Sequence, residues 1–236
     1  MAEVKKQKKM PRKKATKRQK MDWFAAYVFI APVTIGLFAF YIWPFFQNLW
    51  FSFNDVNKFN VSHFVGLENY KNILTDMTIW RSFGNTLKYV VITVPVGLFF
   101  SIVLAALLNA GIKGKSLYRT LYFLPSVTMS AAVAMVWKWV FNEQMGILNS
   151  FIKKLGGTGH NWLTDPHTAL YMIMIVGLWM SVGYNMIILL AGIQGISKSY
   201  YEAAAIDGAT AIDQFFHITM PMLTPSIFFV TITSII

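Results

Sequence analysis

The sequence predicts an all-α polytopic transmembrane bundle, and three observations lead to that prediction. Of the 236 residues, 56% are hydrophobic and only 13% are charged, whereas soluble domains carry charge on about 25%. The apolar residues gather in runs of about twenty, the length that crosses about 30 Å of hydrocarbon. The basic residues concentrate in the N-terminal arm and in one short connection, as they do on the cytoplasmic side of membrane proteins.

Four complete spans are expected, followed by part of a fifth. The expected complete spans are residues 23–46, 89–108, 121–141 and 169–190. A fifth apolar run begins near Leu223 and reaches Ile236 after fourteen residues, which is too few to cross a bilayer. We therefore expect residues 21–236 to form one transmembrane domain that is incomplete at its C-terminal end.

The net charge of +11 is concentrated in the first twenty residues. This arm holds ten Lys and Arg against one acid, so it contributes +9 and leaves +2 for the rest of the chain. A basic arm directly before an apolar run is typical of a cytoplasmic segment that touches anionic lipid. The alternative is a nucleic-acid-binding tail. We expect no nucleic-acid partner, because no aromatic residue is interleaved among these charges.

The basic residues of the connections predict the orientation of the spans. Residues 109–120 carry Lys113, Lys115 and Arg119 without an acid, so this loop is expected in the cytoplasm together with the N-terminus. Alternation then puts residues 54–85 and 142–168 outside. The polar segment 191–222 is expected to return to the cytoplasm.

Segment 191–222 is predicted to contain two short helices separated by a glycine. Ser199 and Glu202 are spaced as a capping box for the first helix, and Gly208 suits its left-handed C-terminus. Thr210 and Asp213 repeat the capping spacing for a second helix, which we expect Pro221 to end. Such a helix pair is too small to fold alone and needs a surface on which to dock.

The same segment resembles the cytoplasmic signature of the transmembrane permease subunits of ABC importers. That signature is Glu-Ala-Ala, three residues, Gly, nine residues, and Ile-x-Leu-Pro; here Met220 replaces the Leu. In the family this segment is the coupling helix that seats on an ATPase subunit. The resemblance therefore implies an ATPase-coupling role for Glu202, Ala203, Ala204, Asp207, Gly208, Ile218 and Pro221.

Three further elements resemble the carbohydrate-uptake branch of these type I importer permeases. They are FVGLENYKNIL (64–74), RTLYFLP (119–125) and WKWVFNEQMGILN (137–149), and the GLENY element is typical of the maltose and glycerol-phosphate type. The resemblance implies a bacterial inner-membrane subunit that works with a second permease, two ATPase subunits, an extracellular solute-binding protein and a sugar. ATP and Mg would lie on the ATPase subunits, with no cofactor on this chain and no enzymatic activity of its own.

Three other readings remain open at this point. A permease for phosphate, osmolytes or amino acids would share the cytoplasmic signature but should lack the three additional elements. An intramembrane enzyme would need ionisable groups that converge within the spans, and Lys138, near the end of one, is the only charge inside them. A non-transporting membrane scaffold would not associate with an ATPase.

Two sets of small or hydroxylated residues are candidates for lining a sugar passage. Gly177, Ser181 and Tyr184 recur at i, i+4 and i+7 on one helical face, and Ser126 and Ser130 at i and i+4 on another. Close helix packing explains the same pattern equally well. No metal site is expected, because the chain has no Cys and its four His lack ligand spacing.

Overall fold

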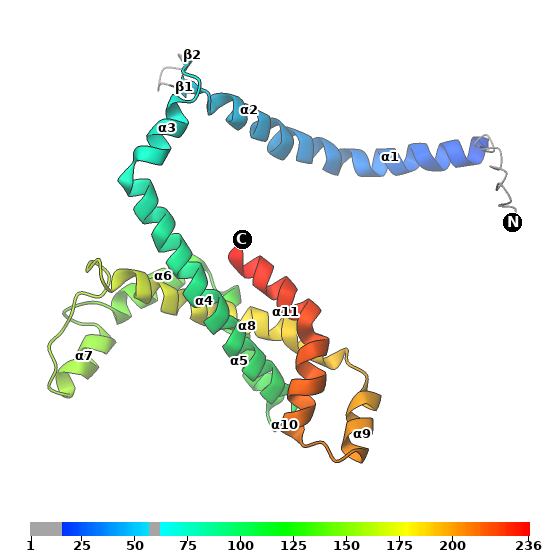
Figure 1. Cartoon of the computed structure of the whole chain (residues 1–236), viewed down its shortest axis with the longest axis vertical. Coiled ribbons are helices and arrows are strands. Elements are labelled where there is room, and N and C mark those ends of the chain that lie inside the picture. Colours follow the sequence, from blue (N-terminus) through cyan, green and yellow to red (C-terminus); the bar gives the residue numbers. More distant parts are fainter. Residues whose placement is uncertain (1–15, 57–61) are drawn as a thin grey trace, which may run out of the picture. The chain divides into compact units, whose positions relative to one another are not determined.

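The computed structural model describes residues 16–56 and 62–236 (Figure 1). The chain divides into two compact units, Met1–Ile79 and Trp80–Ile236, and each is described by itself. Most of the basic arm lies outside the described residues. Its last residues, Lys17, Arg18 and Lys20, open the first helix.

The first span is a single helical stretch, Lys17–Phe51, which extends past the predicted range at both ends. It comprises α1 (Lys17–Leu37), a π-helical turn η1 (Phe38–Ile42) and α2 (Trp43–Phe51). Pro44 explains the wide turn, because its ring would press on the carbonyl four residues earlier in a regular α-helix. The Trp43 amide instead donates to the Phe38 carbonyl, five residues back.

A short hairpin and a helix complete the first unit, and the sequence analysis predicted no strands there. Strands β1 (Asn54–Val56) and β2 (Ser62–Phe64) pair antiparallel, with Asn54 opposite Phe64, and α3 spans Glu68–Thr75. The GLENY element holds this region together. The Asn69 side-chain amide donates to the Ser52 and Asn54 carbonyls at 3.0 Å each, and the Tyr70 hydroxyl lies 2.7 Å from that of Ser52.

The second unit contains the remaining helices, which are joined by short connections. Its elements are α4 (Met77–Asn109, which starts in the first unit), α5 (Lys115–Val127), α6 (Ser130–Val140), α7 (Ile147–Lys154), α8 (Ala169–Gln194), α9 (Lys198–Ile206), α10 (Ala211–Gln214), η2 (Phe215–Thr219) and α11 (Met220–Ile235). Helices α4 and α8 contain the predicted second and fourth spans and extend beyond them.

The predicted third span, residues 121–141, is not one continuous helix. Helices α5 and α6 meet at Thr128 and Met129, both of which leave the helical conformation, and the two helices are bent by 96°. Pro125 cannot donate to the Leu121 carbonyl, and the Thr128 hydroxyl takes the Leu124 carbonyl at 2.8 Å. With 13 and 11 residues, neither helix alone covers about 30 Å at about 1.5 Å per residue.

The predicted fifth apolar run lies within a longer helical stretch. Helices α10, η2 and α11 form one stretch, Ala211–Ile235, whose 25 residues are long enough to cross a membrane. Pro221 therefore does not end a helix. It follows η2 at the same distance as Pro44 follows η1, and the Met220 amide reaches back to the Phe215 carbonyl. The π turn makes room for the proline ring, so the helix continues through it.

The core of the second unit lies where α4, α8 and α11 meet. Ala105 and Leu108 of α4, several α8 residues, and Leu223 and Val230 of α11 are buried together. The Ser101 hydroxyl adds a polar link, since it lies 3.1 Å from the Val182 carbonyl. This pattern of apolar contact with a few interhelical hydroxyl bonds is typical of membrane helices.

Three glycines let α8 approach three different neighbours. A side chain at Gly177 would overlap the Tyr89 hydroxyl of α4, and one at Gly183 the Tyr122 carbonyl of α5. At Gly192 it would meet the Ser226 side chain of α11 at 2.6 Å. Small residues at helix contacts in a membrane serve this purpose.

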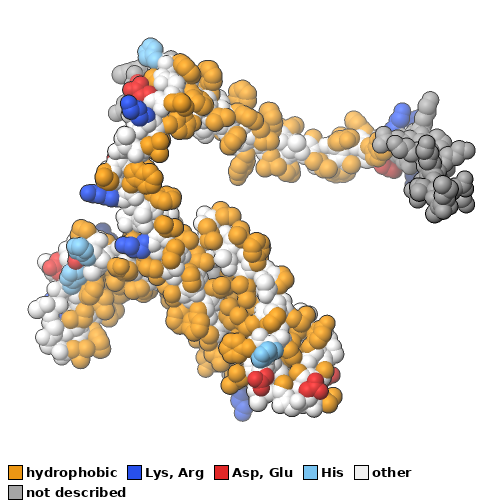
Figure 2. Space-filling view, in the orientation of Figure 1, with side chains coloured by type: hydrophobic (Ala, Val, Ile, Leu, Met, Phe, Trp, Pro, Cys, Tyr) orange, Lys and Arg blue, Asp and Glu red, His pale blue; other side chains and the backbone are white. Residues whose placement is uncertain are grey.

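The surface of the long helices is strongly apolar. Four helical stretches in the described part of the chain are long and apolar enough to span a membrane, and the bent pair α5–α6 makes a fifth if it counts as one span. Figure 2 shows hydrophobic side chains over most of the visible surface of α1, η1 and α2. Phe29 of α1 and Phe40 of η1 are among the exposed side chains. Such a surface suits lipid or another apolar partner.

Candidate functional site

A polar pocket lies among the transmembrane helices of the second unit. It has a volume of about 240 Å³ and is formed by residues of α4, α8 and α11. Its polar side chains are Tyr89, Thr93, Ser181, Tyr184, Asn185, Thr233 and Ser234. We call this set, with Val94, Gly97 and Gly177, the polar pocket.

The three candidates on α8 lie together at this pocket. Gly177, Ser181 and Tyr184 all line it, as their spacing on one helix face predicts. Gly177 also serves helix packing, because the Tyr89 hydroxyl occupies the space of a side chain. Ser181 and Tyr184 are exposed to the pocket instead.

Ser126 and Ser130 do not share a helix face, so that interpretation was wrong. The break between α5 and α6 separates them, since Ser126 lies before it and Ser130 is the first residue of α6. The Ser126 hydroxyl donates to the Phe123 carbonyl at 2.7 Å. Neither serine lines the polar pocket.

Several pocket residues were not among the predicted candidates. Tyr89 and Thr93 come from α4, Asn185 from α8, and Thr233 and Ser234 from α11. Asn185 is buried, and its side-chain amide donates to the Ser234 hydroxyl at 3.4 Å. A buried amide within an apolar run was a signal in the sequence, because an unpaired polar group is costly in a membrane. The other residues could not be predicted, because they reach the pocket only through the packing of α4, α8 and α11.

Residues 191–222, which we call the coupling segment, contain a first helix with a different N-cap from the predicted one. Helix α9 starts at Lys198 and its N-cap is Ser197, whose extended backbone orients its hydroxyl toward the Ser199 amide at 3.4 Å. Ser199 therefore lies inside the helix, with its hydroxyl 2.8 Å from that of Ser197. Glu202 is not needed for a capping box, and its side chain is exposed.

Gly208 ends α9 as predicted. Its φ of +82° is left-handed, the Gly208 amide donates to the Ala205 carbonyl, and the Ala209 amide donates to the Ala204 carbonyl at 2.9 Å. These two bonds form a Schellman motif. Ala204 thus has a backbone role besides its place in the signature.

The second predicted cap is confirmed. The Asp213 amide donates to the Thr210 hydroxyl at 3.3 Å, and the Thr210 amide donates to the Asp213 carboxylate at 3.0 Å. This box starts the long helical stretch that leads to α11. A further bond joins the two helices of the segment, with the Tyr201 hydroxyl 2.9 Å from that of the buried Thr219.

The coupling segment presents an exposed surface that includes two large apolar side chains. Ile206 is 87% exposed and Ile212 is 70% exposed. Glu202, Ala203 and Asp207 are exposed beside them. Figure 2 shows acidic side chains at this end of the second unit. Of the other predicted coupling residues, Ile218 is half-buried in η2 and Pro221 is exposed on α11.

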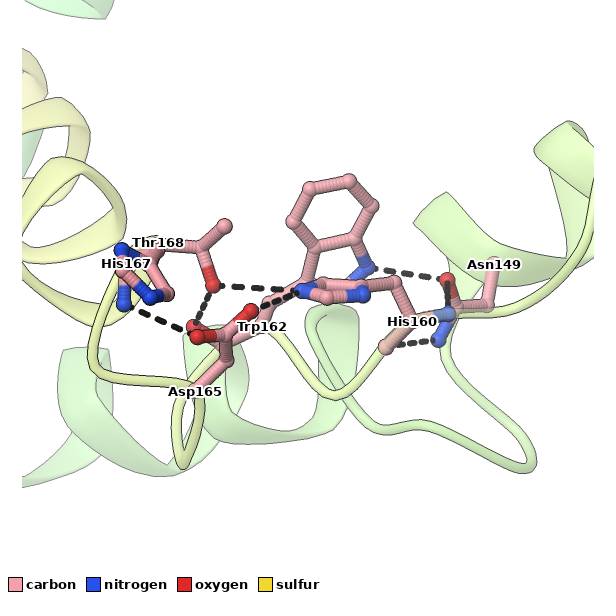
Figure 3. Close-up of polar contacts among 6 residues, drawn as sticks. All are labelled: Asn149, His160, Trp162, Asp165, His167 and Thr168. Atoms are coloured by element: carbon pink, nitrogen blue, oxygen red, sulfur yellow. Dashed lines mark hydrogen bonds and ion pairs between the residues drawn. The ribbon is translucent and has the colours of Figure 1, made fainter.

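The connection between α6 and α8 is organised around one buried side chain (Figure 3). Asn149 of α7 is fully buried, and its amide nitrogen donates to the carbonyls of Asn142 (3.2 Å), Glu143 (3.1 Å) and His160 (2.8 Å). Its carbonyl oxygen accepts from the His160 amide at 3.1 Å and the Trp162 indole at 2.8 Å. All of its hydrogen-bonding capacity is thus used to fold this loop.

An ion pair closes the other side of the same loop. His160 Nε2 lies 2.8 Å from the Asp165 carboxylate, and the Thr168 hydroxyl donates to the Trp162 carbonyl at 2.9 Å (Figure 3). The backbone amide of His167 donates to the Asp165 carboxylate at 2.8 Å. This bond is the largest cause of the lowered pKa of that carboxyl, and the interaction with His160 is a smaller one. Within the described residues, no three His, Asp, Glu or Cys side chains group as a metal site.

Comparison with known proteins decides the family. Residues 94–236 match the protein family described as the binding-protein-dependent transport system inner membrane component. These residues contain most of the polar pocket and the whole coupling segment. The chain belongs to this family. It is therefore a multi-pass inner-membrane permease component rather than an enzyme, and the predicted resemblance is confirmed.

Individual relatives agree with this assignment. The permease is 37% identical over 219 residues to the probable ABC transporter permease protein YesP of Bacillus subtilis, covering 92% of this chain and 70% of that protein. It is 33% identical to the sn-glycerol-3-phosphate transport system permease protein UgpA of Pectobacterium atrosepticum, with coverage of 89% and 71%.

Solved structures show the same fold. A chain of a bacterial ABC transporter involved in the import of the acidic polysaccharide alginate superposes with a TM-score of 0.82, at 23% identity, over 92% of this permease and 74% of that chain. The alginate transporter in complex with its pentasaccharide-bound periplasmic protein gives 0.77 at 24% identity, with coverage of 89% and 70%. The predicted fold class, a helical bundle of the ABC importer permease kind, is confirmed.

Proposed function

We propose that this permease forms half of the translocation pathway of an ATP-driven sugar importer. Its partners are a second permease, two ATPase subunits that hold ATP and Mg, and an extracellular solute-binding protein that delivers the sugar. The polar pocket receives the sugar, and the coupling segment docks on one ATPase subunit. The N-terminus and the coupling segment lie in the cytoplasm.

The exposed surface of α9 is the observation that carries this proposal. The side chain of Ile206, 87% exposed, stands beside the exposed Glu202 and Ala203 of the family signature. A large apolar side chain flanked by small and acidic residues fits a groove with apolar walls and a basic group. Ile212, at the start of the long helical stretch, extends the same kind of surface.

The connection between the two sites explains how docking would act on the pathway. The stretch Ala211–Ile235 begins in the coupling segment and carries Thr233 and Ser234 of the polar pocket. Its 25 residues reach roughly 37 Å at about 1.5 Å per residue. Closure of the ATPase subunits on ATP would push α9, and the Tyr201–Thr219 bond would pass this movement to the long helix. Two discrete arrangements of that helix then open the pocket to either side.

The test uses the full-length permease reconstituted with its second permease, ATPase subunits and binding protein in proteoliposomes. Ile206→Glu places a charge in the proposed contact, and we expect ATP-dependent sugar uptake and ATPase co-purification to fall at least about tenfold. Ile147→Glu on α7 is the matched control, because Ile147 is also an exposed isoleucine.

Each outcome of this experiment bears on the proposal. Normal co-purification and uptake by Ile206→Glu would contradict the docking assignment. Uptake of phosphate, osmolytes or amino acids with no uptake of any sugar would contradict the substrate class. Lack of uptake by the wild-type complex, despite stable association with the ATPase, would favour a scaffold.

A further inference from the structure

We propose that the polar pocket selects an uncharged sugar ring and discriminates against anionic sugars and sugar phosphates. This inference rests on the proposed function, because it names the ligand class of the same pathway. It concerns the face of the pathway that this chain contributes. Three features carry it: the absence of charge in the pocket, the direction of its hydroxyl groups and its size.

None of the described residues that line the polar pocket is charged. Lys88 precedes Tyr89 on α4 and so projects about 100° away around the helix. Lys138 is not among the lining residues; it lines an adjoining hollow that shares Tyr89 and Gly177 with the polar pocket. A carboxylate or phosphate in the polar pocket would have no cation among the residues that line it, and an unpaired charge at membrane depth is expensive.

Three of the six hydroxyl groups of the pocket face it only as acceptors. Thr93 donates its proton to the Tyr89 carbonyl at 2.7 Å, Ser181 to the Leu178 carbonyl at 3.3 Å, and Thr233 to the Phe229 carbonyl at 2.9 Å. A hydroxyl has one proton and two lone pairs, so these three oxygens can offer only lone pairs to a ligand. Lone pairs attract the O–H donors of a sugar and repel an anionic oxygen.

The remaining side chains suit a neutral ring as well. Tyr89 and Tyr184 bring two aromatic rings to the pocket, and the apolar C–H face of a sugar can pack on an aromatic face. Asn185 offers both a donor and an acceptor. The volume of about 240 Å³ on this face of the pathway leaves room for a sugar ring.

This ligand class differs from those for which two of the compared transporters are named. Their names refer to sn-glycerol 3-phosphate and to the acidic polysaccharide alginate, and both are anionic. A shared fold does not fix the charge of the ligand, because the side chains of the site decide it. In the present pocket those side chains favour a neutral polyol.

The experiment compares ligands that differ only in charge. Binding of methyl galactoside and methyl galacturonoside, and of methyl glucoside and methyl glucuronoside, is measured on the full-length permease complex in nanodiscs without binding protein. Each pair exchanges one CH₂OH for a carboxylate. We expect the neutral member of at least one pair to bind at least about tenfold more tightly, which is a difference of one decade in Kd.

Variants with a lysine in the pocket supply the reverse test. Ser181→Lys, or Tyr184→Lys as a second position in the pocket, should raise uronoside affinity at least about tenfold by giving the anion a partner. Ser126→Lys is the matched control, because Ser126 lies outside the pocket, and it should leave the preference unchanged.

The outcomes separate this inference from the proposed function. Tighter uronoside binding by the wild type, or saturable binding of none of the four probes, would overturn the inference. Sugar uptake by the same complex with its binding protein is measured in parallel. Intact uptake in either of those cases leaves the proposed function standing, whereas loss of all sugar uptake by the wild type contradicts the proposed function itself.

Discussion

Gly208 is a residue whose role follows from its backbone alone. Its φ is +82°, yet no atom lies within 4 Å of where a side chain would start. Gly208→Val should therefore fail through backbone strain of about 1–2 kcal/mol rather than through a clash. We expect substrate-stimulated ATPase activity and uptake to fall sharply in Gly208→Val. Gly208→Asn should retain most activity, because Asn tolerates the left-handed region. Equal loss in both variants would show that the side chain itself obstructs docking.

Tyr201 is predicted to position α9 against the long helix. Tyr201→Phe removes only the hydroxyl that lies 2.9 Å from Thr219, a change of about 1 kcal/mol. We expect ATPase turnover to continue while the sugar moved per ATP falls several-fold. The control is Tyr200→Phe, since Tyr200 is exposed on the same helix. The assignment fails if the two variants have the same ratio of transport to hydrolysis.

Sequence reasoning at the residue scale succeeded where the signal is local. Gly208 and the Thr210–Asp213 box follow from spacing, and both are confirmed. Ser199 was wrong as a cap, because Ser197 is an equally good capping residue and only its extended backbone decides between them. Thr233 joins the polar pocket through contacts between distant helices, which no local pattern reveals.

At the scale of elements, Asn149 determines how the loop between α6 and α8 folds. Asn149→Ala leaves the Trp162 indole and several backbone groups without their partner, at about 1–3 kcal/mol for each group that stays buried. Hydrogen exchange of residues 142–168 in the assembled complex should therefore rise strongly. Asn161→Ala, an exposed position in the same loop, should change little. Unaltered exchange in Asn149→Ala would contradict the organising role.

The same loop should lose order in acid. The Asp165 pKa is lowered mainly by the His167 amide, so its contribution to loop stability is complete above the unfolded pKa of about 3.9. That contribution disappears as pH falls through the lower folded pKa. Loop protection in hydrogen exchange should therefore drop below about pH 4 in the wild type. In Asp165→Asn it should already be reduced at neutral pH and change less with acid. An identical acid profile in the two proteins would contradict this assignment.

The long helices were predicted as helices, the short hairpin β1–β2 was missed, and the other errors at this scale occur at prolines. Residues 121–141 were expected to form one span, but the chain bends by 96° shortly after Pro125. Pro221 was expected to end a helix, but a π turn absorbs it and the helix continues. Whether a proline bends, ends or only widens a helix depends on the neighbours that satisfy the freed carbonyls. A single sequence does not contain that information.

At the scale of the whole permease, the proposed coupling has a requirement of topology. The family signature in α9 must face the cytoplasm, and the surface that receives the binding protein must face the outside. The stretch Ala211–Ile235 carries coupling residues near its start and pocket residues near its end, so its direction across the membrane matters. The basic loop with Lys113, Lys115 and Arg119 favours a cytoplasmic position for the connection between α4 and α5. If the bent pair α5–α6 counts as one span, alternation puts α9 on the same side and the Asn149 loop on the other, as the proposed function requires.

Labelling of single cysteines tests this orientation. The chain has no cysteine, so Thr158→Cys and Ser199→Cys each create one site in an otherwise unreactive protein, and both positions are exposed. A membrane-impermeant maleimide should label Thr158→Cys in intact cells. It should label Ser199→Cys only in inverted vesicles, because α9 must reach an ATPase in the cytoplasm. Labelling of both positions from outside would remove the ATPase from reach of Glu202 and Ile206, and with it the proposed coupling route to the polar pocket.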